Sequence, residues 1–63
     1  MQEGIVKFFN DAKGFGFITV QTTGNEIFVH TSNLIDHIKE NDKVYFKVEQ
    51  GQKGIMATQV RKM

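Results

Sequence analysis

Aromatic residues are concentrated in two short stretches of this chain, and their spacing is the feature that could do chemistry. Phe15 and Phe17 are two residues apart, and Phe28 and His30 repeat that spacing further along. Successive side chains of a β-strand point to opposite faces, so residues two apart share a face. Flat rings on an exposed strand surface are what unpaired nucleic-acid bases stack on. The pattern therefore indicates a stacking surface if both stretches are strands.

Both stretches have the composition of strands, and the segment between them predicts a hairpin. β-Branched and aromatic residues follow one another in each, and residues 21–25 between them contain Gly24-Asn25. The opposite faces of the two strands carry aliphatic residues, namely Ile18, Val20, Ile27 and Val29. One arrangement buries the aromatic residues and exposes the aliphatic ones. We favour the reverse, because Ile and Val are more often fully buried and the aromatic face also carries His30.

The length of the chain makes exposed aromatic residues informative. Residues 1–63 are expected to form a single domain. A domain of this size buries only about 60% of the surface of its unfolded chain and is marginally stable. Leaving Phe15, Phe17 and Phe28 outside the core is a cost that calls for a function.

Composition excludes several classes of site. The chain has no cysteine and only two histidines, so we expect no thiolate chemistry, metal site or other cofactor. The net charge is +1, so neutralisation of phosphates cannot be the main source of affinity for nucleic acid. Stacking of bases must therefore contribute more of that affinity than charge does. Ser32 and His30 are close in sequence, but no third orienting group is suggested, so we expect no enzyme and no small-molecule substrate.

No apolar run approaches the roughly 20 residues of a membrane span, and the N-terminal residues lack the features of a signal peptide. The prediction is a cytoplasmic monomer with no membrane partner.

Three further strands are expected. Residues 4–9 predict the first, with a bulge or bend at Phe8-Phe9, where strict alternation breaks and either ring could face outward. A polar turn, 10–14, follows it. Residues 43–50 alternate clearly, with Val44, Phe46 and Val48 predicted to face inward. Residues 55–62 predict the last strand, whose buried face stays open, after a turn over 51–54.

Between the hairpin and the fourth strand, the spacing of Leu34, Ile35 and Ile38 predicts about one helical turn, capped by Thr31 or Ser32. Five short strands with so little helix indicate an all-β domain. Curling into a small barrel avoids open sheet edges, so we predict a five-stranded antiparallel barrel.

Two motifs carry a resemblance to a known family. Residues 13–18, Lys-Gly-Phe-Gly-Phe-Ile, resemble the first ribonucleoprotein motif, and residues 27–30, Ile-Phe-Val-His, resemble the second. Their order and the lack of room for two long helices argue against the RNA-recognition-motif fold. The chain resembles the cold-shock domain family instead, over nearly its whole length. That resemblance implies an oligonucleotide-binding (OB) fold that binds single-stranded RNA or DNA and acts as an RNA chaperone or regulator of gene expression.

The resemblance also implies which positions contact nucleic acid: Lys7, Phe8, Asn10, Lys13, Phe15, Phe17, Phe28, His30 and Lys53. Asn10 could be partly structural, and Lys53 could be a plain solvated lysine of a turn. The alternative for His30 is a simple surface histidine at the end of a strand, but its place in the motif favours stacking.

The chain departs from the family pattern at four places. Phe8 stands where Trp is usual, Thr31 replaces an aromatic residue, and Ile55 replaces a proline. The segment 34–42 is also shorter than the usual loop. These departures imply a shorter or weaker footprint on the strand. The alternative function is a small β-barrel module that binds peptides, since proline-rich ligands also dock on aromatic grooves. Such grooves usually contain Trp, and this chain has none.

Overall fold

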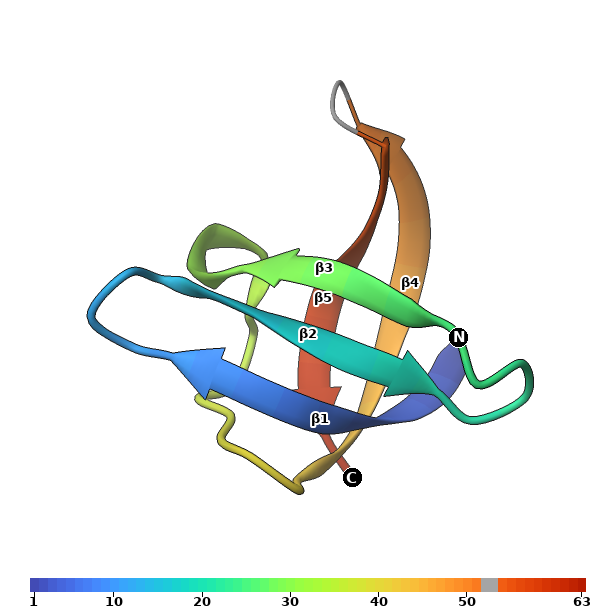
Figure 1. Cartoon of the computed structure of the whole chain (residues 1–63), viewed down its shortest axis with the longest axis horizontal. Helices are drawn as coiled ribbons and strands as arrows, with labels where there is room; N and C mark the ends of the chain where they lie inside the picture. Colours follow the sequence, from blue (N-terminus) through green and yellow to red (C-terminus); the bar gives the residue numbers. More distant parts are fainter. Residues whose placement is uncertain (52–53) are drawn as a thin grey trace.

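The computed structural model describes residues 1–51 and 54–63, and within them the chain folds as a closed barrel of five strands (Figure 1). In chain order these are β1 (Gln2–Asn10), β2 (Phe15–Val20), β3 (Glu26–His30), β4 (Lys43–Gly51) and β5 (Gly54–Lys62). A short 3-10 helix, η1 (Thr31–Asn33), follows β3. None of the helices in the described residues has the length and hydropathy needed to cross a bilayer.

The strands are joined in the order β1-β2-β3-β5-β4, and β4 returns to pair with β1. Neighbouring strands are antiparallel except β3 and β5, which are parallel and share only two residue pairs. In Figure 1, β1 to β3 lie side by side across β4 and β5, and the far end of the β4–β5 hairpin extends beyond the barrel. The predicted five-stranded barrel is confirmed, with this one parallel seam.

Aliphatic side chains fill the barrel, as the pattern of β2 and β3 predicts. Ile18 and Val29 are fully buried, and Ile27 packs against the core from its rim. Phe46 is the largest fully buried side chain. The core consists of Val6, Ile18, Val20, Val29, Ile38, Val44, Phe46, Ala57 and Val60.

The predicted bulge in β1 is present, and it decides between Phe8 and Phe9. Val6 pairs with Ile18 while Phe8 pairs with Phe17, so Lys7 is an extra residue in the ladder. An extra residue reverses the alternation of faces. Phe8 is therefore 38% exposed, whereas Phe9 packs against the core.

A second bulge lies in β5. It determines which residues of this strand face the core, an assignment that the sequence pattern left open. Tyr45 pairs with Arg61 and Lys47 pairs with Thr58, so two residues of β5 lie opposite Phe46. One of them, Gln59, has a φ of 51°, which non-glycine residues rarely adopt.

Two local predictions are wrong. Val48 is 37% exposed rather than buried, although its partner in the ladder, Ala57, belongs to the core. The predicted helical turn over Leu34 to Ile38 does not form. Instead, Leu34 forms a β-bridge with Val60, and the Ile35 amide donates to the Val60 carbonyl at 2.7 Å.

The only helical turn in the described residues is η1, which begins three residues earlier than predicted. His30 caps it, since its ring accepts a hydrogen bond from the Ser32 amide, so the predicted caps Thr31 and Ser32 are also wrong. A ring nitrogen is not among the side-chain groups that usually cap helices, and the sequence pattern therefore gave no sign of it.

Candidate nucleic-acid interface

The outer face of β1 to β3 is built from residues that lie opposite one another in register. Phe8 pairs with Phe17, and Phe17 pairs with Phe28. Phe15 pairs with His30 in the adjacent row. Residues directly opposite one another on neighbouring strands share a face, so the strand pairing itself assembles the aromatic group. We call Phe8, Phe15, Phe17, Phe28 and His30 the ring cluster.

The rings of the cluster are in mutual contact. The centroids of Phe8 and Phe17 are 5.6 Å apart, and those of Phe17 and Phe28 are 6.0 Å apart. Phe15 stacks on Phe28 at 6.0 Å with an interplanar angle of 22°. Such contacts within 4.5–7 Å stabilise aromatic groups and fix their orientation. The cluster is thus a preformed surface rather than a set of independent side chains.

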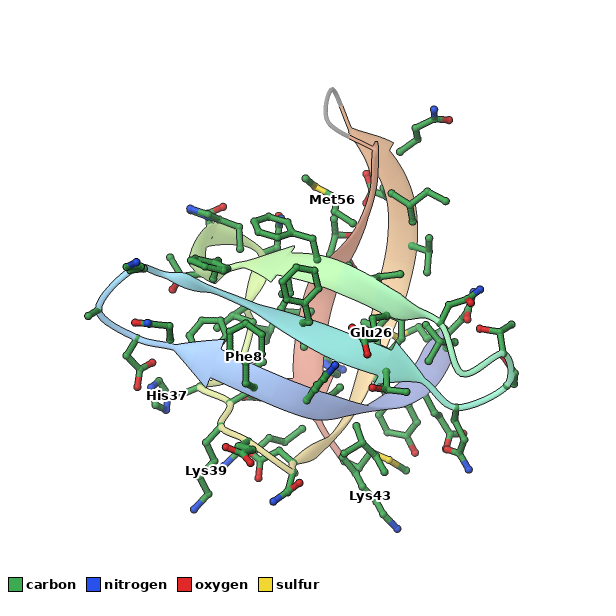
Figure 2. All side chains as sticks on the ribbon, viewed as in Figure 1. Phe8, Glu26, His37, Lys39, Lys43 and Met56 are labelled. Carbon is green, nitrogen blue, oxygen red and sulfur yellow. The ribbon has the colours of Figure 1, made fainter. Side chains whose placement is uncertain are left out.

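The exposure of the rings differs along the cluster. Phe8 and His30 are exposed, whereas Phe15, Phe17 and Phe28 are half-buried because each packs against its neighbours. In Figure 2, Phe8 projects from the front of β1, away from the barrel interior. The ring faces are therefore partly in water and partly supported from the side, as a stacking surface requires.

Glycine is needed beneath this surface. A Cβ atom on Gly16 would lie 2.3 Å from the carbonyl oxygen of Phe8 and 2.8 Å from the Cα of Phe9. The two strands that carry Phe8 and Phe17 approach closely only because this position has no side chain. Gly14 has a φ of 76° and its carbonyl accepts from the Thr31 amide, which ties the first turn to η1.

His30 is held in one orientation by η1. Its Nδ1 accepts from the Ser32 amide at 3.1 Å and lies 2.9 Å from the Ser32 hydroxyl oxygen. An accepting Nδ1 places the ring proton on Nε2, so that this nitrogen is the donor available to a ligand. Its ring lies 6.5 Å from that of Phe28.

The predicted polar contacts have different surroundings. Asn10 accepts from the Lys13 amide at 3.0 Å through its side chain, so it shapes the β1–β2 turn. Lys13 is exposed in that turn. Lys7 forms an ion pair of 2.6 Å with Glu26, reaching across β2 from β1 to β3. Lys53, also predicted to contact nucleic acid, lies outside the described residues.

Two residues at this face were missed from the sequence. Glu26 is acidic and holds Lys7, and Met56 of β5 pairs with Phe28 and extends the aromatic row by one strand. Figure 2 shows Glu26 over the front of the sheet and Met56 at the base of the β4–β5 hairpin. The parallel pairing that brings Met56 beside Phe28, and the ion pair that crosses β2 from Lys7 to Glu26, both join residues far apart in the sequence, so spacing alone could not have found either position.

The family described as the 'Cold-shock' DNA-binding domain matches residues 2–63 of this chain. The chain belongs to this family. The resemblance inferred from the two motifs is thereby confirmed.

Relatives of the cold-shock domain include small bacterial proteins of similar length. The chain is 51% identical to the cold shock-like protein CspG of Shewanella violacea, over 90% of this chain and 87% of that protein. It is 48% identical to the major cold shock protein CspA of Pseudomonas aeruginosa, over 95% of this chain and 91% of that one. A solved structure described as drosophila Unr CSD456 matches with a TM-score of 0.84 and 25% identity, over 98% of this chain and 26% of that one.

Membership of the cold-shock family sets the class of activity. The chain is a single-stranded nucleic-acid-binding protein that acts through its exposed aromatic cluster, and it is not an enzyme. Membership of the family does not by itself assign the individual contacts.

Proposed function

We propose that a single strand of RNA or DNA lies across β1, β2 and β3 with its bases stacked on the ring cluster. The observation that carries this proposal is the contiguous set of half-exposed rings, with centroids 5.6–6.5 Å apart on three adjacent strands. Phe8, Phe17, Phe28 and His30 are the stacking residues, and Phe15 supports Phe28 from the side. Each base stacked on an aromatic residue contributes about 1–3 kcal/mol by alanine substitution.

Electrostatics plays the smaller part. Lys7, Lys13 and Lys53 are the cations that approach the phosphates, and Asn10 contributes mainly by shaping the turn that presents Lys13. Three phosphate contacts on a single strand give a log–log salt slope of about −2. Lys39 and Lys43 lie on the other side of β1, away from the row that leads to β3 (Figure 2), and take no part in this contact.

The mode of binding defines the biological activity. Every base has a π-face, so stacking tolerates many sequences and accepts both RNA and DNA. Bases held on the rings are unavailable for pairing. A protein that traps melted strands in this way acts as an RNA chaperone without ATP, and through that as a regulator of gene expression. We place it in the cytoplasm as a monomer.

The footprint is expected to be short. Thr31 is exposed beside His30, where an aromatic residue would otherwise continue the cluster, and the segment 34–42 contains no Phe, Tyr or Trp. Stacking therefore ends at His30 on this side of the sheet.

The test is a titration of the 15N-labelled protein with oligothymidine, followed by NMR. The Phe17→Ala/Phe28→Ala variant is expected to lose at least about thirtyfold in affinity, because two stacking steps are removed, while its spectrum still shows a folded barrel. Tyr45→Ala changes an aromatic residue of β4 outside the cluster and should bind as the wild type does.

Two outcomes would reject the proposal. One is undiminished affinity of the double variant for oligothymidine. The other is binding of a proline-rich peptide to the ring cluster in preference to oligothymidine, which would favour the peptide-binding alternative.

A further inference from the structure

The aromatic row does not end at β3. Phe28 pairs with Met56 across the parallel seam, and Met56 pairs with Glu49 of β4. Paired residues share a face, so the outer surface continues from the rings to a thioether and then to a carboxylate. Met56 is half-buried, and its flexible side chain offers an apolar contact next to the last ring.

Beyond Met56 the surface is hollowed. A depression of about 270 Å³ lies between the segment that follows β3 and the β4–β5 hairpin. Leu34 and Ile35 line it on one side, and Glu49, Thr58 and Gln59 line it on the other. Pockets for drug-sized ligands span roughly 300–1,000 Å³, so this one suits a smaller group such as a single base. We call it the Glu49 pocket.

The Glu49 pocket is continuous with the ring cluster through the residues of η1. Ser32 and Asn33 also line the pocket. Ser32 contacts the His30 ring at 2.9 Å, and the Asn33 side-chain amide donates to the Met56 sulfur at 3.7 Å. A strand that leaves Phe28 and His30 therefore reaches the pocket without losing contact with the protein.

The backbone of β5 is arranged to line this pocket. Thr58 and Gln59 are consecutive residues, which in a regular strand would point to opposite faces. Both nevertheless line the pocket, because the bulge opposite Phe46 places Gln59 at a φ of 51°. A rare backbone conformation held at a pocket is an observation from which a functional hypothesis can start.

The chemistry of the pocket is set by a fixed acceptor. The Thr58 hydroxyl, on a residue only 8% exposed, donates to the Glu49 carboxylate at 2.6 Å and holds it in place. A carboxylate has two oxygens with about four acceptor sites, so it can accept further hydrogen bonds. Guanine presents two adjacent donors on one edge, its N1–H and its 2-amino group. Thymine and uracil present a single N–H between two carbonyl oxygens, which a carboxylate disfavours.

We propose that the Glu49 pocket is an additional base-binding subsite that selects guanine over thymine or uracil at one end of the bound strand. Glu49 accepts hydrogen bonds from the N1–H and 2-amino group of guanine, and Thr58 is a positioning residue for that carboxylate. Met56 provides an apolar contact to the strand between the ring cluster and the pocket. This inference rests on the proposed function, because the subsite is reached from the ring cluster.

The test compares oligothymidine with the same oligomer carrying one guanine at its 5′ or its 3′ end. We expect guanine at one end only to raise the affinity of the wild type about tenfold, as a two-point base contact does. Adenine at that end stacks equally well but turns a ring acceptor toward the carboxylate, so it should give no gain. Inosine lacks the 2-amino group and should give an intermediate gain.

Two variants examine the pocket itself. Glu49→Gln should reduce the preference for guanine to about twofold or less, while binding of plain oligothymidine stays within about threefold of the wild type. Glu49→Val/Thr58→Val removes the acceptor and its buried partner together, and should abolish the preference without leaving an unpaired hydroxyl. Glu40→Gln makes the same change of charge in the exposed loop before β4 and should keep the full preference.

The outcomes separate this inference from the proposed function. If the wild type binds oligothymidine but shows no end preference for guanine, or if Glu49→Gln keeps the preference, the subsite is overturned and the proposed function stands. If oligothymidine does not bind at all, the proposed function is overturned and the subsite with it.

Discussion

At the scale of single residues, one missing side chain matters as much as the rings. Gly16 lies in β2 between Phe15 and Phe17, where a Cβ atom would meet the β1 backbone at less than 3 Å. We expect Gly16→Ala to lower the free energy of unfolding by about 1–3 kcal/mol, because β1 and β2 must move apart. Urea denaturation measures this change. For a domain this small, it is a large share of the total stability.

Gly24→Asn is the matched control for that substitution. Gly24 has a φ of 75° in the hairpin turn, and a Cβ atom there would have no neighbour within 4 Å. Asn tolerates this left-handed conformation, so the free energy of unfolding should change by less than about 0.5 kcal/mol. A Gly16→Ala variant as stable as the wild type would contradict the close approach of the two strands.

At the scale of elements, the ion pair that joins β1 to β3 restrains a cation of the interface. Lys7 and Glu26 are both about half exposed, so their pair stabilises the fold by less than about 1 kcal/mol. A phosphate must compete with Glu26 for Lys7. We expect Glu26→Gln to raise the affinity for oligothymidine about three- to tenfold at low salt, and this gain should shrink as the salt concentration rises.

Titrations at several salt concentrations measure both quantities for Glu26→Gln. Glu40→Gln removes the same charge from a loop and serves as the control. Equal affinities and equal salt slopes for the two variants would show that Lys7 does not contact phosphate.

The elements also show what the sequence could predict and why the rest escaped it. The β2–β3 hairpin and the bulge beside Phe8 each depend on residues that are close together in the sequence, so the local spacing of residue types was sufficient to predict both. The turn predicted at Leu34 failed because that segment is held by Val60, far away in the chain. Met56 and the Lys7–Glu26 pair likewise depend on which strands become neighbours, and no local pattern records that.

At the scale of the whole molecule, a small and marginally stable domain should respond strongly to its ligand. A free ligand concentration of one hundred times Kd stabilises a protein by about 2.7 kcal/mol. In domains of 60–100 residues each kcal/mol shifts Tm by about 4–8 °C. Oligothymidine at that excess should therefore raise Tm by about 10–20 °C.

Thermal unfolding followed by circular dichroism measures this shift. A stable DNA hairpin with the same number of phosphates is the control, because its bases are paired and cannot stack on the rings. A shift of the same size with the hairpin would mean that phosphate attraction, rather than stacking, drives binding.

The parallel seam between β3 and β5 has a consequence for local opening of the barrel. It consists of two residue pairs, Phe28 with Met56 and Val29 with Ala57, which is fewer than in any other strand pairing of the described residues. We therefore expect β3 and β5 to separate more easily than the other paired strands. One of those pairs is also where the aromatic row crosses from one strand to the next. A strand of nucleic acid bound there would bridge β3 and β5 and oppose their local separation. Amide hydrogens of β3 and β5 should therefore exchange with solvent more slowly in the complex than in the free protein.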